Sequence, residues 1–221
     1  MVASGGPMAA HQFAAAQANQ PQVAEIRINH DIFVENQRLE FIFLDLLRGT
    51  GLHGGFVETA TCSDLPQGRL QIRQGVTVEQ AMDELVAANP GYEWELKDGV
   101  VNLTPRGGAQ LLGTKIAKFQ MDATDWEMEA ALQDVLRLPE VREREASLGL
   151  KGGTHAGPRA GAVEKRPLSR QPMPVHINLQ SVSLQEAFNQ VVALSLDGVW
   201  IYRETDCNGA KTYTVEMRSD H

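Results

Sequence analysis

The pattern of apolar and polar positions in residues 70–104 predicts a short strand, then a helix, then a hairpin. Leu70 and Ile72 alternate with polar neighbours, which is the period of a strand with one buried side. Thr77 is placed to cap the helix, because Gln80 follows three residues later and completes a capping-box pattern. Apolar residues then recur on one helical face: Val78, Ala81, Met82, Leu85 and Val86.

A hairpin completes this unit. Asn89-Pro90-Gly91 ends the helix, since proline cannot continue the backbone ladder and glycine accepts a left-handed turn. The alternating residues 92–96 and the returning strand at 100–104 are joined by Asp98-Gly99, a two-residue turn typical of hairpins.

The same pattern recurs in residues 175–217, where a second hairpin turns at Asn208-Gly209. A weaker alignment matches residues 39–47 with residues 184–192. We therefore expect an α+β fold of tandem small strand–helix–hairpin units, whose helices pack on small mixed sheets. The strongest repeat lies at one fixed offset, at which Val76, Ala81, Val86 and Ala87 reappear as Val182, Ala187, Val192 and Ala193.

These patterns divide the chain into two units and their connections. Residues 1–22 are rich in small residues without a periodic apolar face, and we expect a disordered tail. The first unit spans residues 23–105, residues 106–114 form a connection, and the second unit spans residues 115–221. Within it, residues 142–172 carry seven Lys or Arg against three acids, with several Gly and Pro, and we expect a flexible basic insertion. A helix that continues as far as Leu150 stays open as an alternative for its first part.

Further elements follow from the same reasoning. Strands are expected at 23–29, 56–59 and 115–121, and helices at 38–48 and 126–138. The helix at 38–48 is the most apolar of the chain, so we expect neighbours on more than one side. Its water-facing positions are Glu40, Asp45 and Arg48.

Composition and charge exclude two classes of function. The chain has 221 residues, of which 43% are hydrophobic, and these are enough for a core. No apolar run approaches the length of about 18 residues that a membrane helix needs, so we expect no transmembrane segment. The net charge of −8 argues against nucleic acid as the partner, because phosphate binding depends on a surplus of Lys and Arg.

Two motifs resemble sites but stand in the wrong context. Residues 49–54 spell G-x-G-x-x-G, yet a helix precedes them and a strand follows, which is the reverse of a dinucleotide-binding turn. We interpret these glycines as the end of a helix. Asp122, Asp125 and Glu127 suit the positive end of a helix dipole better than a metal site.

The reactive residues are few. The six histidines are scattered, and two cysteines provide neither a CxxC pair nor a zinc set. A dyad of Cys62 and His53 would lack an orienting third group, so we expect no catalytic residue, no metal and no cofactor. The weaker alignment places Cys62 opposite Cys207, and two alternatives stay open: free thiols, or a disulfide if their Cα atoms approach within about 6–7 Å.

The helix motifs resemble those of the secretin and TonB short N-terminal domain, the STN domain. Residues 38–52, RLEFIFLDLLRGTGL, are similar to its L-x-x-x-L-x-x-L-x-x-x-T-G-L helix, and residues 77–85, TVEQAMDEL, to its T-V-E-x-A-L-x-x-L helix. The resemblance covers residues 23–105, and residues 175–217 resemble the latter half again. It implies a periplasmic or cell-envelope module of a diderm bacterium that binds other proteins and has no catalytic residues. Residues 16–18 read Ala-Gln-Ala, like a secretory cleavage site, but no apolar core precedes them.

The first functional hypothesis is therefore a non-catalytic protein–protein interaction module of the cell envelope. It would bind a protein partner at exposed sheet edges, since an unpaired strand accepts another strand. A second hypothesis is a small enzyme or ligand-binding carrier with a site between the repeats, near His53, Cys62 and Trp200. A third is a purely structural envelope protein. The candidate interaction surface consists of aromatic residues on the two hairpins: Tyr92, Trp94, Trp200 and Tyr202.

Overall fold

A computed structural model of the protein describes residues 25–62, 65–125, 127–152, 171, 173–195 and 198–218. The expected α+β fold is confirmed, and the elements fall into two repeats whose order differs only in that two helices of the second repeat stand in the place of the first helix of the first repeat. The first repeat contains β1 (Ile32–Arg38), α2 (Leu39–Leu47), β2 (His53–Thr61), β3 (Gln67–Ile72), α3 (Val78–Ala88), β4 (Tyr92–Lys97) and β5 (Val100–Pro105). The second contains β6 (Lys115–Thr124), α4 (Met128–Leu136), α5 (Pro139–Leu148), β7 (Leu150–Gly152), β8 (Pro174–Ser183), α6 (Leu184–Val192), β9 (Val199–Cys207) and β10 (Ala210–Arg218).

Each repeat contains one outer and one inner sheet. The outer sheets are antiparallel pairs, β1 with β3 and β6 with β8. The inner sheets have the orders β4-β5-β2 and β9-β10-β7, and in each the hairpin is antiparallel while the third strand is parallel to its neighbour. Strand β2 pairs with β9 in parallel, which joins the inner sheets into one six-stranded sheet of order β4-β5-β2-β9-β10-β7.

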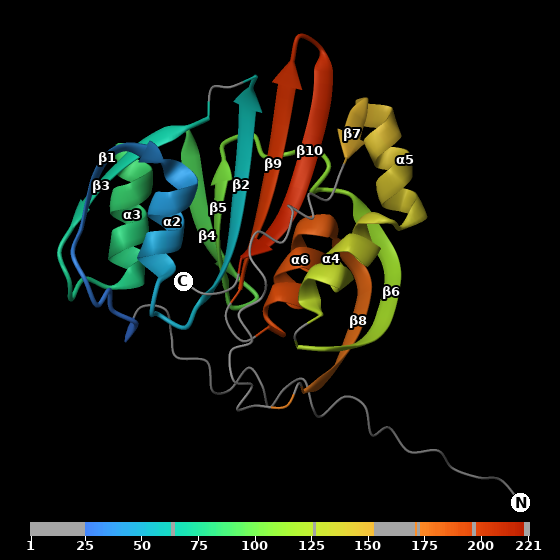
Figure 1. Ribbon diagram of the computed structural model, residues 1–221, viewed down its shortest axis with the longest axis horizontal. Coiled ribbons are helices and arrows are strands. Elements are labelled where there is room, and N and C mark those ends of the chain that lie inside the picture. Colours follow the sequence, from blue (N-terminus) through green and yellow to red (C-terminus); the bar gives the residue numbers. More distant parts are fainter. Residues whose placement is uncertain are drawn as a thin grey trace, which may run out of the picture.

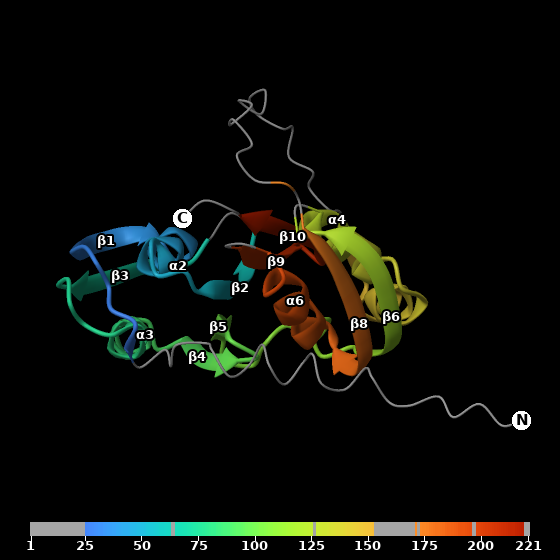
Figure 2. The same ribbon diagram turned by 90° about the horizontal axis from the view of Figure 1, so that it is seen from below.

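The second repeat is turned over relative to the first. Strand β4 is antiparallel to β5, β5 is parallel to β2, and β2 is parallel to β9, so the equivalent strands β4 and β9 run in opposite directions. Helices α2 and α3 accordingly cover one face of the central sheet, and α4 and α6 cover the other (Figures 1 and 2). Each outer sheet lies beyond its own pair of helices (Figure 2).

We call the parallel pair of β2 and β9 the joint between the repeats. Both strands are buried on both faces, as expected of central strands in a covered sheet. On β9, Val199 and Ile201 belong to the core of the first repeat, whereas Trp200 and Tyr202 belong to the core of the second. Strand β2 behaves in the same way, since Phe56 points into the first core and Val57 contacts the second. The two repeats therefore share their central strands and form one folded body.

Capping boxes begin the equivalent helices α3 and α6. The predicted box is confirmed in α3, where Thr77 Oγ1 accepts from the Gln80 N–H at 3.2 Å and Gln80 Oε1 accepts from the Thr77 N–H at 3.1 Å. In α6 the same roles fall to Ser183 and Glu186. Helices α3 and α6, one in each repeat, thus begin through the same local signal.

We expect replacement of Glu186 by glutamine to lower stability only above acidic pH. The hydrogen bond from Lys97, supported by those from Ser183, lowers the pKa of Glu186 to about 2, and Lys97 Nζ lies 2.8 Å from the carboxylate. A depressed pKa contributes stability that is present above the unfolded value near 4.5 and is lost as pH falls toward 2. Urea titrations across this range should show a difference of about 0.5–1 kcal/mol at pH 6 that vanishes near pH 2. A difference that is constant with pH would contradict this.

In its described residues, 25–29, the strand predicted at 23–29 is reduced to an isolated antiparallel bridge between Arg27 and Thr77. Within the described part of this segment the backbone docks on the turn before α3, where the Ile28 N–H donates to the Val76 carbonyl at 2.9 Å. Ile28 is buried in the core of the first repeat, and Ile26 packs against the same core. The first strand is β1, whose alternation is broken by a bulge at Asn36, a residue with φ of 54°.

The flexible insertion predicted at 142–172 is wrong for its first part. Residues 142–152 complete α5 and form β7, because Pro139 starts the helix and Gly149, with φ of 66°, ends it. Glu145 fixes this segment, since its carboxylate accepts from the Gly152 N–H at 3.0 Å and from the Tyr213 hydroxyl at 3.3 Å. The rest of the predicted insertion, apart from residue 171, and the predicted tail at 1–22 lie outside the described residues.

Candidate functional site

Strand β4 forms one edge of the central sheet, and within the described residues only β5 pairs with it. Asp98 and Gly99 have φ of 54° and 76°, the left-handed values of the two-residue turn that was predicted there. Lys97 and Val100 flank this turn and form a hydrogen-bonded pair. From there, hydrogen-bonded and non-hydrogen-bonded pairs alternate along the hairpin, and Trp94 and Leu96 belong to non-hydrogen-bonded pairs. The backbone N–H and C=O groups of Trp94 and Leu96 therefore point away from β5, toward the open edge.

Side chains along β4 give this edge an apolar face. Tyr92 is only 8% exposed and stacks on Phe56, with ring centroids 6.2 Å apart, and burial raises the pKa of its hydroxyl. Trp94 is half-buried, and its Nε1 donates to Asp83 Oδ1 on α3 at 2.9 Å. Leu96 is 47% exposed. On this face of β4, the side chains of Tyr92 and Trp94 are held in place by their contacts, and the next side chain, Leu96, is exposed to solvent.

The opposite face of β4 carries Glu93, Glu95 and Lys97, where Glu93 lies 3.6 Å from Arg106 and Lys97 lies 2.8 Å from Glu186. Glu93 and Glu95 are exposed there, beside a pocket of about 390 Å³ that lies between the hairpin and the start of α6. Gln185, on the first turn of α6, donates to Glu95 at 3.4 Å. A bound strand at this edge would meet apolar side chains on one face and carboxylates on the other.

The equivalent edge of the second repeat is already occupied. The turn at Asn208 and Gly209 has φ of 55° and 82°, so the same alternation turns the backbone groups of Trp200 and Tyr202 away from β10 and toward β2. Two hydrogen bonds bracket this row, since the Gly54 N–H donates to the Gly198 carbonyl at 3.0 Å and the Cys62 N–H to the Asp206 carbonyl at 3.2 Å. The joint between the repeats is thus a parallel strand added to the counterpart of β4.

The equivalence of the two edges extends to side chains. Trp200 Nε1 donates to Asn189 Oδ1 on α6 at 2.8 Å, as Trp94 does to Asp83 on α3. The residue of β2 that lies opposite the buried Trp200 is Gly55, which has no side chain. A Cβ on Gly55 would lie 2.4 Å from the Trp200 ring. In the joint, a side chain at position 55 would therefore collide with the Trp200 ring.

Half of the predicted interaction surface is wrong. Trp200 and Tyr202 have no exposed area, because β9 is an interior strand of the six-stranded sheet. The pattern of a hairpin does not reveal whether its edge is paired by a distant strand. Tyr92 and Trp94 do lie on an edge strand, and Tyr92 contributes mainly buried area.

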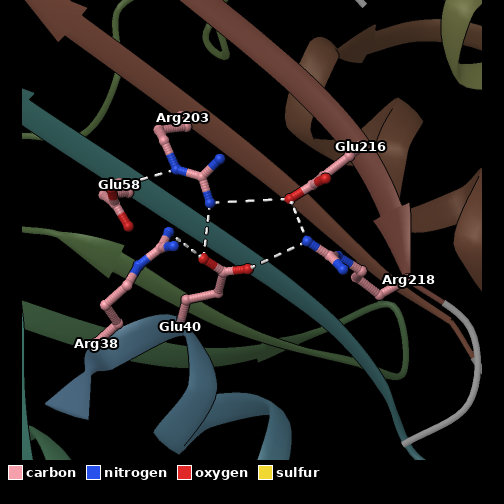
Figure 3. Close-up of polar contacts among 6 residues, drawn as sticks. All are labelled: Arg38, Glu40, Glu58, Arg203, Glu216 and Arg218. Atoms are coloured by element: carbon pink, nitrogen blue, oxygen red, sulfur yellow. Dashed lines mark hydrogen bonds and ion pairs between the residues drawn. The ribbon is translucent and has the colours of Figure 1, made fainter. Parts of the chain in front are cut away.

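A network of six charged residues fastens the repeats together (Figure 3). Glu40 begins α2 and was expected to face water, but it is fully buried, as is Glu58 on β2. Arg203 on β9 joins them, with Nη2 2.7 Å from Glu40 and Nε 3.3 Å from Glu58. The other members surround this centre: Arg38 lies 2.5 Å from Glu40, and Arg218 lies 3.9 Å from Glu40 and 3.1 Å from Glu216.

The chemistry of this network favours a structural role. Burial raises the pKa of Glu58, and the positive charges of Arg203 and Arg38 oppose that effect. Three guanidinium groups face three carboxylates, and guanidinium groups do not release protons in proteins. The arrangement therefore holds α2, β2, β9 and β10 together and is poorly suited to proton transfer.

The residues of the alternative enzyme site are not brought together. His53 begins β2 and Cys62 follows its last residue, so the nine residues of the strand place them roughly 30 Å apart at about 3.3 Å per residue. Cys62 and Cys207, by contrast, come directly after Thr61 and Asp206, the last residue pair of β2 and β9. Both are unbonded thiols. The weaker alignment that predicted their proximity pairs α2 with α6, which occupy different places in the two repeats; the counterpart of α2 is α4 with α5.

The three carboxylates near α4 serve separate local roles. Glu127 accepts from the Thr124 N–H and hydroxyl, both at 2.9 Å, and Asp125 accepts from the Met173 N–H at 2.9 Å. Asp122 lies 2.6 Å from His176 across the β6–β8 sheet. The described segments contain no group of three or more potential metal ligands.

One sequence signal for the joint was overlooked. The pattern Gly-Leu-x-Gly-Gly occurs at 51–55, where β2 begins, and again at 149–153, where β7 begins. Both strands are the parallel third strands of their inner sheets. This repeat predicts β7, which the basic composition of the segment obscured.

Comparisons of the chain with protein-family models, with curated proteins and with solved structures give no match. Among the described helices, none has the length and apolar character needed to span a membrane. The functional argument therefore depends on the geometry of the edges and the joint.

Proposed function

We propose that the protein is a non-catalytic interaction module that binds an extended segment of a partner protein along the open edge of β4. One observation carries this proposal: the equivalent edge on β9 is filled by a parallel strand, β2, within the same chain. Strand addition supplies affinity through backbone hydrogen bonds and specificity through alternate side chains. At β4, the backbone N–H and C=O groups of Trp94 and Leu96 would make these bonds. They correspond to the backbone groups of Trp200 and Tyr202, which face β2 in the joint.

The joint also indicates the chemistry of the partner. By analogy with Gly55 opposite Trp200, the partner carries a small residue opposite Trp94 and runs parallel to β4. An apolar residue next to Leu96 would cover its exposed surface. Basic residues on the other face would meet Glu93 and Glu95, which adds attraction at low salt.

The resemblance to STN domains supports a place in the cell envelope of a diderm bacterium. In support, the two motif helices of the first repeat pack in one core, α2 against β2 and α3 against β4, and they follow one another in the order that the resemblance implies. A protein-binding module of that class has no need of a catalytic site. We include the envelope location in the proposal on this basis.

Replacement of Leu96 by proline tests the edge directly. The Leu96 N–H points away from β5, so proline removes a donor for the partner without removing a bond of the hairpin. We expect partner affinity to fall about tenfold or more, the equivalent of one lost hydrogen bond, while the free energy of unfolding changes by less than about 1 kcal/mol. Extended peptides selected from a displayed library on the full chain serve as probes, with affinities measured by fluorescence anisotropy.

Leu96→Thr is the matched control, because threonine keeps the N–H and favours strands. It should retain binding better than the proline variant. A photocrosslinker at Leu96 should also capture a partner from an envelope extract, whereas one at Phe33, which is 59% exposed on β1, should not. Selected peptides that bind wild type and Leu96→Pro equally would rule out the β4 edge.

A further inference from the structure

Cys62 and Cys207 lie next to each other where the joint between the repeats ends. The parallel register of β2 and β9 runs to the pair Thr61 and Asp206, so the two cysteines are the next residues in line. The Cys62 N–H donates to the Asp206 carbonyl at 3.2 Å, so the two strands are still in contact at this point. Paired strands are about 4.8 Å apart, and disulfides require a Cα separation of about 4.4–6.8 Å.

Both thiols are accessible and interact with each other. Cys62 is exposed and Cys207 partly exposed, and neither is bonded to another cysteine. The hydrogen bond with Cys62 raises the pKa of the Cys207 thiol. Cys62 has a φ of 51°, so the chain leaves the strand direction there, and an oxidant can approach from solvent.

We propose that Cys62 and Cys207 form an oxidation site, at which a small or protein disulfide oxidant creates an intramolecular disulfide across the joint. The Cys62 thiolate attacks one sulfur of the oxidant disulfide, which forms a mixed disulfide and releases one oxidant thiolate. The Cys207 thiolate then attacks the Cys62 sulfur and releases the second. The protein loses two electrons and two protons, and the oxidant disulfide is reduced to two thiols.

The bond would close a loop that contains most of the second repeat. Strand β2 belongs to the first repeat and β9 to the second, so the disulfide would prevent the two inner sheets from separating. Disulfides that close long loops restrict the unfolded chain most. This oxidation site requires no partner protein and is independent of the proposed edge function.

The test uses the reduced full chain and oxidised glutathione as the oxidant. We expect both free thiols to disappear, the protein mass to fall by about 2 Da, and Tm to rise by roughly 10 °C, with reversal by a reductant. The internal bond should form at least tenfold faster in the folded protein than in denaturant. Cys62→Ser and Cys207→Ser should instead each retain one glutathione as a mixed disulfide.

Three results would overturn the proposal. Wild type that accumulates two stable mixed disulfides would show that the thiols do not reach each other. Disulfide-linked dimers as the main product would show that the reactive pairing is between chains. An internal bond that forms as fast in denaturant as in buffer would show that the fold does not align the cysteines.

Discussion

Replacement of Arg203 by alanine is expected to lower the free energy of unfolding by about 3–5 kcal/mol. The guanidinium lies between Glu40 and Glu58, which are buried carboxylates from different elements of the first repeat. Removal of the cation leaves both charges less compensated in a place that water does not reach, and this penalty is larger than the loss of one exposed ion pair. Urea denaturation followed by tryptophan fluorescence measures the effect. It should decrease at acidic pH, because burial raises the pKa of Glu58 and this carboxylate loses its charge as pH falls.

Arg218→Ala is the control for this prediction. Arg218 belongs to the same network, but its side chain is 49% exposed and lies 3.9 Å from Glu40 (Figure 3). An exposed pair contributes about 1 kcal/mol or less, so this variant should remain close to wild type. Equal losses from Arg203→Ala and Arg218→Ala would show that burial does not determine the strength of the network.

Replacement of Trp200 by alanine is expected to cost about 3–5 kcal/mol of stability, because the whole indole is buried. The ring packs against Phe188, with centroids 5.5 Å apart, and against Gly55 of the other repeat. The loss of the indole also leaves the buried Asn189 without its N–H donor. Thermal and urea denaturation should agree on the size of the loss.

Trp94→Ala provides the matched comparison, since Trp94 occupies the same place in the first repeat but is only half-buried. We expect a smaller cost of about 1–2 kcal/mol, together with weaker partner binding, because Trp94 lies on the open edge. A larger loss of stability from Trp94→Ala than from Trp200→Ala would contradict the assignment of β4 as the edge and β9 as the interior strand.

Local signals in the sequence account for the parts of the fold that were predicted correctly. The capping box at Thr77 and the glycine turns at 98–99 and 208–209 depend on residues a few positions apart, and each was recognisable without knowledge of the rest of the chain. Strand β1 was missed because its bulge at Asn36 interrupts the alternation. Strand β7 was missed because its three residues show no alternation of their own, and because the basic composition of the segment obscured the Gly-Leu-x-Gly-Gly repeat that marks it.

The candidate site could be predicted only in part, because edges are determined by distant pairing. Trp94 and Trp200 stand in similar local patterns, yet one lies on an edge and the other is enclosed. Glu40 looked like a water-facing residue of an amphipathic helix, and its burial depends on Arg203, far along the chain. No periodicity within α2 carries that information.

The inverted arrangement of the repeats gives the central sheet a polarity. Among the described strands, one end of the sheet is β4, the proposed acceptor edge, and the other is β7, the counterpart of the strand that fills the β9 edge. The two ends are therefore different surfaces, and any assembly that continued the sheet would grow head to tail with one orientation. Successive repeats along such an assembly would place their helices on alternate faces of the sheet. The helices would therefore cover both faces of the sheet to the same extent.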